Sequence, residues 1–247
     1  MSQHEAAYRR VLGALRSLIL RGDLREGDRL PSIREIVAEY GVSAGTAARA
    51  ISALASEGVV IARHGSGVYV RRFRAIRRSS PGRLSRQQWG TGQRISDADI
   101  PERALVSNIE VGEIAAPEWA AEALGIEPDS RVIFRSRQYV VDEKAVQLAT
   151  SYYPVDLARG TRITYTDTGP GGSYAVLAEL GHGPTRFTEY VLARMPRPDE
   201  TSRLDLPDGT PVIEITRHAF EEGDRCVEAN RMILDGSAYL LDYSFSA

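Results

Sequence analysis

The strongest constraint on the fold is a pair of short helices separated by a tight turn that contains glycine. Ser32 and Glu35 have the spacing of a capping box, which predicts a helix that starts at Ser32 and ends at Gly41. One residue separates this glycine from the next N-cap candidate, Ser43, and a further helix is expected to run to Gly58. Two helices joined in this way form a helix-turn-helix.

The segments on either side complete a small domain. Apolar residues at helical spacing predict an amphipathic helix over residues 6–21. After Gly58 the pattern changes to two runs of β-forming residues, 59–61 and 68–70, with a glycine-rich tip between them. Three helices followed by a hairpin predict a winged helix-turn-helix over residues 1–72.

The 247-residue chain has a net charge of −2, but the charge is unevenly distributed. Residues 1–78 contain 14 arginines and 7 acidic residues, a net charge of +7. The remainder has 17 basic and 26 acidic residues, a net charge of −9. This asymmetry indicates a nucleic-acid-binding segment joined to a second domain, although a chance fluctuation among surface charges would give the same numbers.

Several classes of protein are not expected. A single cysteine cannot form an internal disulfide, and no apolar run is long enough to span a membrane, so we expect a cytoplasmic protein. The four histidines and the cysteine show no metal-ligand spacing. The sequence contains no Walker, GxSxG or complete GxGxxG pattern. We therefore expect no metal, no cofactor and no enzymatic activity.

A second domain follows a basic linker, predicted over residues 73–99. Residues 71–88 are rich in arginine and also contain Ser, Pro and Gly, which is typical of a solvated tether, although the arginines could also contact phosphates. Residues 100–247 contain strand-like runs with few helices, and short polar turns join several of the strands, which favours antiparallel pairing. Strands are expected at 105–114, 132–141, 145–153, 187–194, 212–220, 226–234 and 239–245, and helices at 117–124, 173–180 and 199–204. The predicted fold class is α+β, a winged helix-turn-helix followed by a domain built around an antiparallel sheet.

The helix-turn-helix also predicts which side chains face DNA. Its second helix lies in the major groove with its N-terminal residues toward the base edges. Arg49 can contact either a guanine or a phosphate. Ser43 and Thr46 can bind a phosphate or a base edge; the alternative is that Ser43 serves only as a cap and Thr46 only in packing. The glycines of the hairpin tip allow a close approach of the backbone to the minor groove. The candidate DNA-contacting residues are Ser32, Arg34, Ser43, Gly45, Thr46, Arg49, His64, Gly65 and Gly67.

The second domain contains a candidate anion pocket. Arg135 and Arg137 are two apart on a strand, so both point to one face, where paired guanidinium groups suit a carboxylate or phosphate. The glycine-rich loop 169–173 leads into a helix N-terminus, which also favours anions. The alternative is that both arginines pair with Glu189 and Glu228 in a cross-strand charge ladder. The candidate effector-binding residues are Arg135, Arg137, Ser173, Tyr174, Glu189, Arg217 and Glu228.

Residues 8–71 resemble the N-terminal domain of the GntR family of bacterial transcription regulators. The matching segments are 22–24, 30–35, 40–43, 57–58 and 65–70. The resemblance implies that Arg34, Ser43, Thr46, Arg49 and the pair His64-Gly65 contact operator DNA. The family usually has arginine at the positions of Ala44 and Ala48, so two expected DNA contacts are missing and the operator sequence cannot be transferred.

Segments 135–137, 147–154, 181–182 and 206–212 of the second domain, together with Glu189 and Arg217, resemble the UTRA effector domain of the HutC subfamily. That resemblance implies a fold similar to chorismate lyase and the binding of small effectors, often sugar phosphates or amino-acid metabolites. Family members often have Glu at the position of Ala149, which weakens any transfer of a hexosamine-phosphate specificity.

Taken together, these patterns predict a homodimeric transcription regulator. We expect a repressor that a small anionic metabolite effector releases from a palindromic double-stranded DNA operator. One alternative is an effector-independent repressor whose second domain only dimerises. Another is a lyase-like enzyme fused to a DNA-binding domain, for which the sequence offers no acid/base or nucleophile constellation.

Overall fold

The computed structural model describes residues 3–63, 65–71, 76–80, 82–89, 105–141 and 144–244. The chain divides into two compact units, an N-terminal unit of residues 1–74 with 206–210 and a C-terminal unit of residues 75–205 with 211–247. Among the helices in the described ranges, none combines the length and the apolar character needed to cross a bilayer.

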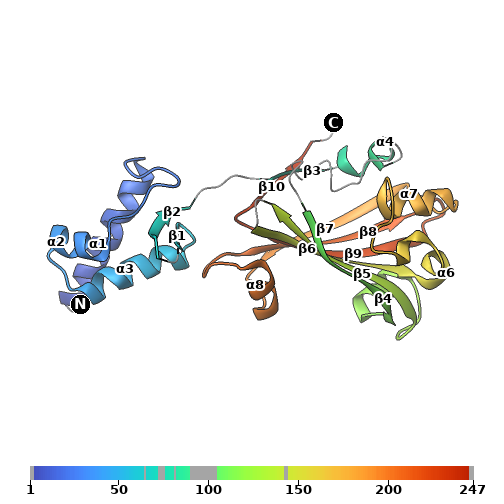
Figure 1. Cartoon of the computed structure of the whole chain (residues 1–247), viewed down its shortest axis with the longest axis horizontal. Coiled ribbons are helices and arrows are strands. Elements are labelled where there is room, and N and C mark those ends of the chain that lie inside the picture. The colour runs from blue at the N-terminus through green and yellow to red at the C-terminus, as the bar shows by residue number, and fades with distance from the viewer. Residues whose placement is uncertain are drawn as a thin grey trace. The chain divides into compact units, whose positions relative to one another are not determined.

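The N-terminal unit is the winged helix-turn-helix that the sequence predicts. Its elements are α1 (Gln3–Leu20), α2 (Ile33–Tyr40), α3 (Ala44–Ser56) and an antiparallel hairpin of β1 (Val60–Arg63) and β2 (Gly67–Val70) (Figure 1). Each helix contributes its apolar stripe to one core, and the hairpin closes it. The fully buried members of this core include Val11, Leu15, Ile36, Ala50, Leu54 and Val60.

Two helix caps determine the geometry of the helix-turn-helix. The Glu35 backbone N–H donates to Ser32 Oγ at 3.3 Å, and the Ser32 backbone N–H donates to the Glu35 carboxylate at 2.6 Å. This is the predicted capping box, and it fixes where α2 begins. Gly41 ends α2 with a left-handed φ of 61°, a conformation that glycine adopts without strain. The chain can therefore enter α3 after only two more residues.

The C-terminal unit is built around an antiparallel sheet, as predicted, and this sheet has six strands. The strands, in spatial order, are β4 (Leu105–Ala115), β5 (Arg131–Val141), β6 (Lys144–Pro154), β9 (Cys226–Asp235), β8 (Val212–Phe220) and β7 (Arg186–Arg194). The strand pairs β5–β6, β7–β8 and β8–β9 are neighbours in the chain as well as in the sheet. β4 and β7 are its edges (Figure 1).

Helices cover both faces of the sheet. On one face, α5 (Glu118–Leu124) packs its alanines and Leu124 against Val132 and Ala229. The opposite face carries α6 (Val155–Ala158), the 3-10 turn η3 (Arg162–Thr164) and α7 (Gly172–Glu179). This face, and not the one that α5 packs against, is the face called the covered face below. These elements enclose a cluster around Tyr153 and Val227. A further helix, α8 (Pro198–Leu204), precedes β8.

A second apolar cluster lies on the covered face. β3 (Ile76–Ser80) and β10 (Tyr239–Tyr243) pair in parallel, outside the six-stranded sheet. Ile76 and Tyr239 of this pair belong to a cluster with Ile215 and Met232. The covered face thus has an apolar cluster of its own at each end, and the residues between the two clusters are free to be polar.

The prediction of a solvated tether is wrong for residues 76–80 and 82–89. These residues form β3, the 3-10 turn η1 (Gly82–Leu84) and α4 (Arg86–Trp89), all of them in the C-terminal unit. Arg78, Arg83 and Trp89 are only 2%, 4% and 2% exposed. The arginine-rich composition suggested an exposed segment, because arginines are seldom buried without a partner. Composition could not show that a carboxylate of another strand pairs with these arginines.

Candidate functional site

The first turns of α3 present small side chains to solvent. Ser43 is the N-cap: its Oγ accepts a hydrogen bond from the Thr46 backbone N–H at 3.1 Å and lies 2.9 Å from Thr46 Oγ1. Ala44 and Gly45 are exposed, and Ala48 is partly exposed. The two hydroxyl groups therefore serve the cap, while methyl and backbone groups form the outward surface of the helix.

Arg49 is held against α1. Its Nη1 lies 3.1 Å from Glu5 Oε2, and its guanidinium carbon lies 4.0 Å from the centroid of the Tyr8 ring. The pKa of Glu5 lies below its ordinary value, because the hydrogen bonds from Arg9 and Arg49 lower it. The Arg9 bond has the largest effect, and desolvation opposes both bonds. Because a guanidinium has five N–H donors, this clamp positions Arg49 without using up its capacity to bind a phosphate.

The remaining predicted DNA contacts lie on α2 and the hairpin. Ser32 serves as the cap of α2, and Arg34 is exposed on the first turn of that helix. Gly65 and Gly67 both have positive φ, and a Cβ on Gly67 would come within 2.8 Å of Arg29 Nε. His64 lies outside the described residues. The hairpin tip thus requires glycine for its own backbone, quite apart from any contact with DNA.

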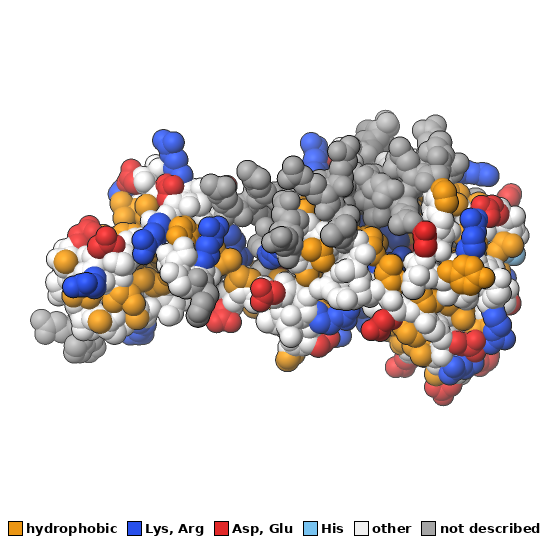
Figure 2. Space-filling view, viewed as in Figure 1, with side chains coloured by type: hydrophobic (Ala, Val, Ile, Leu, Met, Phe, Trp, Pro, Cys, Tyr) orange, Lys and Arg blue, Asp and Glu red, His pale blue; other side chains and the backbone are white. Residues whose placement is uncertain are grey.

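Charge alone does not locate the DNA-binding surface. Figure 2 shows basic and acidic side chains mixed with apolar ones over the visible face of the N-terminal unit. Several arginines of the basic excess pair within that unit, among them Arg9 with Glu5, Arg16 with Glu57 and Arg21 with Asp23, at 3.1, 2.6 and 3.0 Å. The position of α3, the second helix of the motif, therefore indicates the DNA-binding surface better than the distribution of charge does.

In the C-terminal unit, a row of polar residues crosses the covered face of the sheet. Five side chains on five neighbouring strands are directly opposite one another in register, in the order Arg135, Ser151, Asn230, Arg217 and Glu189. The first four are at most 6% exposed, and the Glu189 side chain is 7% exposed. Burying polar groups costs free energy unless they are paired, so such a row indicates a function beyond stability.

Arg217, the fourth residue of this row, lies between two carboxylates. Its Nη1 is 4.0 Å from Glu189 Oε1 and its Nη2 is 3.5 Å from Glu228 Oε2. The guanidinium carbon also lies 5.5 Å from the centroid of the Tyr174 ring. Burial lowers the pKa of Arg217, but Tyr174 and the two carboxylates outweigh it and hold the pKa above its ordinary value. Arg217 is accordingly a fixed positive charge.

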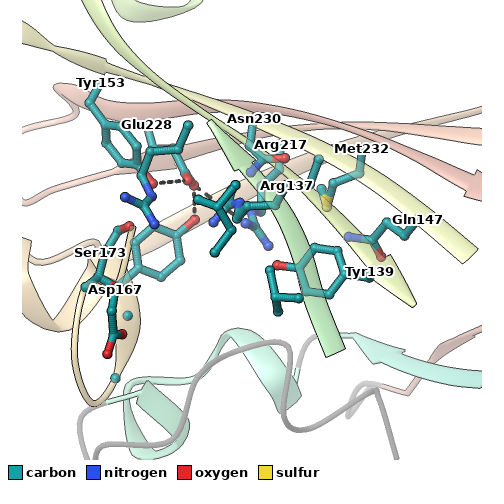
Figure 3. Close-up of a pocket in the computed structure, with 18 of the residues that line it drawn as sticks. Arg137, Tyr139, Gln147, Tyr153, Asp167, Ser173, Arg217, Glu228, Asn230 and Met232 are labelled. Carbon is teal, nitrogen blue, oxygen red and sulfur yellow. Dashed lines mark hydrogen bonds and ion pairs between the residues drawn. The ribbon is translucent and has the colours of Figure 1, made fainter. Parts of the chain in front are cut away.

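Glu228 is a fixed negative charge beside it. It accepts hydrogen bonds from the hydroxyl of Tyr153 at 2.7 Å and from that of Tyr174 (Figure 3). Burial raises the pKa of Glu228, but Arg217 and the Tyr174 hydrogen bond more than offset this, so its pKa lies below the ordinary value. Burial raises the pKa of both tyrosines, which keeps their hydroxyl groups protonated as donors.

Glu189 receives two arginines from the segment that follows the N-terminal unit. Arg78 Nη2 of β3 and Arg83 Nη2 of η1 lie 2.9 and 2.8 Å from the same oxygen, Glu189 Oε1. Burial raises the pKa of Glu189, but the charges of Arg78, Arg83 and then Arg217 overcome it and lower the pKa below its ordinary value. A buried carboxylate with three arginines around it holds the 76–84 segment onto the sheet.

The two arginines of β5 have different roles. Arg135 donates to the backbone carbonyls of Ile163 at 2.7 Å, Thr166 at 3.0 Å and Tyr165, so it supports the wall that follows η3. Arg137 donates to Ser151 Oγ. These bonds are not those of the cross-strand ladder with Glu189 and Glu228, which was the alternative interpretation. Arg217 is instead the cross-strand neighbour of Glu189.

These groups surround a cavity of about 110 Å³ in the C-terminal unit. Figure 3 shows Arg137, Arg217 and Asn230 on the sheet side and Ser173 on the opposite wall. The Nε atoms of Arg137 and Arg217 and the Oδ1 atom of Asn230 are buried and have no hydrogen-bond partner among the described residues. Gly171, Gly172 and Ser173, at the N-terminus of α7, complete the lining. The cavity therefore offers N–H donors suited to an anion.

All seven predicted effector residues meet at this cavity; six line it, and Glu189 adjoins it through Arg78 and Arg83. Sequence reasoning missed those two arginines, Ser151 and Asn230. A signal for Asn230 was present, since Glu228 and Asn230 are polar at alternate positions of β9. In the described part of the chain, no three His, Cys, Asp or Glu residues are gathered as metal ligands.

A winged helix-turn-helix joined to an α+β unit with a polar cavity defines a DNA-binding regulator of transcription. Two family models match the chain: bacterial regulatory proteins of the gntR family over residues 7–70, and the UTRA domain over residues 104–239. An HTH-type transcriptional regulator of Streptomyces coelicolor is 30% identical, the match covering 99% of this chain and 94% of the relative. The HTH-type transcriptional regulator GgaR of Escherichia coli is 26% identical, covering 90% and 84%.

Solved structures agree with these relatives. A GntR-family transcriptional regulator superimposes with a TM-score of 0.67 and 28% identity, over 98% of each chain. PhnF from Mycobacterium smegmatis, with a TM-score of 0.57, 22% identity and coverage of 96% and 99%, shares the fold. The chain belongs to the GntR family of bacterial regulators and carries a UTRA domain. These relatives are regulators, in agreement with the prediction that the chain is not an enzyme.

Proposed function

We propose that this regulator is a homodimeric, cytoplasmic repressor of the HutC subfamily that an anionic effector releases from a palindromic operator. A relative named as a mannosyl-D-glycerate transport/metabolism system repressor, MngR of Escherichia coli, is 24% identical over 96% of this chain and supports the repressor role. A two-fold symmetric dimer would present two α3 helices to half-sites about 34–36 Å apart, one turn of the duplex.

The observation that carries the effector proposal is the charge of the cavity. Five arginines line it, Arg78, Arg83, Arg135, Arg137 and Arg217, against three carboxylates in or beside it, Asp167, Glu189 and Glu228. Five against three leaves a surplus of two positive charges in a buried site. A dianionic group such as a phosphate monoester would balance this surplus, with the Nε–H groups of Arg137 and Arg217 and the N-terminus of α7 as its donors.

The same charges suggest how an effector would act. An anion near Arg78 and Arg83 would compete with Glu189 for both guanidinium groups. These two arginines belong to the segment that follows the N-terminal unit in the chain. Binding would therefore change how firmly this segment is held on the sheet, and the change would reach the DNA-binding unit through the backbone that joins them.

The surface for dimerisation is the free edge of β7. Tyr190, Val191 and Leu192 are 59%, 46% and 57% exposed and lie in succession on both faces of this edge strand. A long apolar edge pairs readily with another strand, and a second copy of β7 across a two-fold axis would continue the sheet.

The decisive experiment is thermal-shift screening of the full chain against sugar phosphates, organic acids and inorganic phosphate. A ligand present at 100 times its dissociation constant stabilises the native state by about 2.7 kcal/mol. We expect an anionic ligand to raise the melting temperature and to release operator DNA in a gel-shift assay. Arg137→Ala should abolish both effects, whereas Arg186→Ala, which removes an exposed arginine paired with Asp224, should preserve them.

Two outcomes would contradict the proposal. If the stabilising ligand shifts Arg137→Ala as much as the wild type, the effector binds elsewhere. If no anion stabilises the chain while it binds its operator tightly, the C-terminal unit serves only for dimerisation. Turnover of the bound ligand would favour the lyase-like alternative instead.

A further inference from the structure

The DNA-facing surface of α3 is unusual in having few polar groups available to read bases. The hydroxyls of Ser43 and Thr46 bind each other and the helix cap, and Arg49 is clamped by Glu5 and Tyr8. The hydroxyl groups of Ser43 and Thr46 are thus engaged within the helix cap, whereas Arg49 keeps N–H donors that can bind a phosphate.

Apolar groups occupy the positions that remain. The methyl groups of Ala44 and Ala48 face outward from the first two turns of α3. A groove beside them continues this apolar surface between α3, the start of α2 and β2; its lining includes Leu30, Pro31, Ile33, Ala48, Ile51 and Val68. Ile33 is 40% exposed. The polar part of the lining comes from Ser32, Ser52, Arg29 and Arg34.

The groove also carries positive charge. Arg29 and Arg34 belong to its lining, and Arg34 lies on the first turn of α2. Arg49 lies on the other side of α3, where it meets α1. An apolar centre with arginines on both sides matches the major-groove edge of a duplex, in which base methyl groups lie between two phosphate backbones.

We propose that Ala44 and Ala48 read the C5-methyl groups of thymines, so that the operator places A·T pairs opposite the first two turns of α3. Arg29, Arg34 and Arg49 then contact phosphates and set the register of the helix. The thymine methyl is the one apolar feature of the major groove, and small side chains such as alanine fit it closely. The inference rests on DNA binding by this family and is independent of the effector, the repressor role and the dimer.

The test begins with selection of bound duplexes from a random-sequence pool by the full chain. We expect a recurrent half-site with thymine at two or more positions. Each selected thymine is then replaced by deoxyuracil, which removes the methyl group and leaves every hydrogen-bonding group in place. Because burial of one methyl group is worth about 0.8 kcal/mol, each replacement opposite Ala44 or Ala48 should weaken binding about fourfold. Deoxyuracil in the flanking sequence should have no effect.

The second part of the test repeats the selection with a variant that gains a contact to a base. Ala48→Arg should change the selected base at one position from thymine to guanine, since arginine binds the guanine edge through two hydrogen bonds. Ala38→Arg, at an exposed position of α2, adds the same charge and should leave the base preference unchanged. Guanine at the positions opposite α3 in the wild-type selection, or equal affinity of the thymine and deoxyuracil duplexes, would overturn the proposal.

Discussion

Replacing Glu189 by glutamine removes one negative charge and keeps the shape of the side chain. In the native state this carboxylate lies 2.9 and 2.8 Å from Arg78 and Arg83, whose side chains are 2% and 3% exposed. Breaking a buried ion pair by removing one partner typically costs 3–5 kcal/mol, because the remaining charge stays buried without compensation. We expect Glu189→Gln to lower the free energy of unfolding of the C-terminal unit by about 3 kcal/mol, and its melting temperature by about 6–12 °C.

Tryptophan fluorescence is a suitable assay, because both tryptophans of the chain, Trp89 and Trp119, pack in the clusters of the C-terminal unit. The matched control is Glu113→Gln, which also removes a carboxylate with two arginine partners. The Glu113 side chain is 28% exposed and both of its arginines are exposed, so the effect should be much smaller. Equal destabilisation of the two variants would refute the reasoning that burial makes the Glu189 network strong.

The pH dependence gives an independent check on the same residue. Because the folded-state pKa of Glu189 is lowered, its contribution to stability is complete above the unfolded-state pKa of about 4.3 and is lost as the pH falls through the folded-state value. The difference in the free energy of unfolding between wild type and Glu189→Gln should thus be constant at neutral pH and shrink in acid.

Inorganic phosphate should also stabilise the variant more than the wild type, since the cavity gains a positive charge when the Glu189 carboxylate is removed.

Three further predictions concern separate parts of the chain. Arg49→Ala should weaken binding to all DNA sequences alike in a gel-shift assay, and unchanged affinity would exclude α3 as the DNA-reading helix. Leu192→Lys on the β7 edge should shift the chain toward monomer in sedimentation analysis, whereas Leu180→Lys, at another exposed leucine, should not; a dimer that withstands both would place the interface elsewhere. Burial raises the pKa of Cys226 to about 11, so a thiol reagent at pH 8 should label the unfolded chain and spare the native one, and rapid labelling of native protein would contradict the burial.

Local patterns in the sequence were enough to predict most of the elements. The capping box at Ser32, the left-handed Gly41 and the hairpin glycines act over a few residues, so their spacing alone indicates the winged helix-turn-helix. Seven strands were expected within a few residues of their observed bounds, because alternating burial leaves a two-residue period. One of them, β10, pairs in parallel with β3 instead of joining the sheet, which depends on a partner more than 150 residues away.

The cavity was harder to predict than the fold. Arg135 and Arg137 were recognised as lying on one face, but strand order decides that Ser151 of β6 meets Arg137 and that Asn230 of β9 meets Ser151. That Arg135 binds carbonyl groups depends on where η3 lies, and nothing local to β5 specifies this. Contacts between side chains far apart in sequence depend on the strand order and on the placement of the helices, so local sequence patterns cannot predict them.

Part of the charge asymmetry that pointed to DNA comes from arginines that pair within the C-terminal unit. Arg77 and Arg78 were counted in the basic third, but both belong to β3, where Arg77 lies 2.7 Å from Asp242 and Arg78 binds Glu189. Residues 1–74 alone have 12 arginines and 7 acidic residues, a net charge of +5. Each phosphate contact contributes about −0.9 to the slope of log affinity against log salt concentration. Arg77→Ala should therefore leave this slope unchanged, while Arg49→Ala should make it shallower by about one contact. A shallower slope in Arg77→Ala would mean that Arg77 contacts the operator and that β3 belongs to the DNA interface.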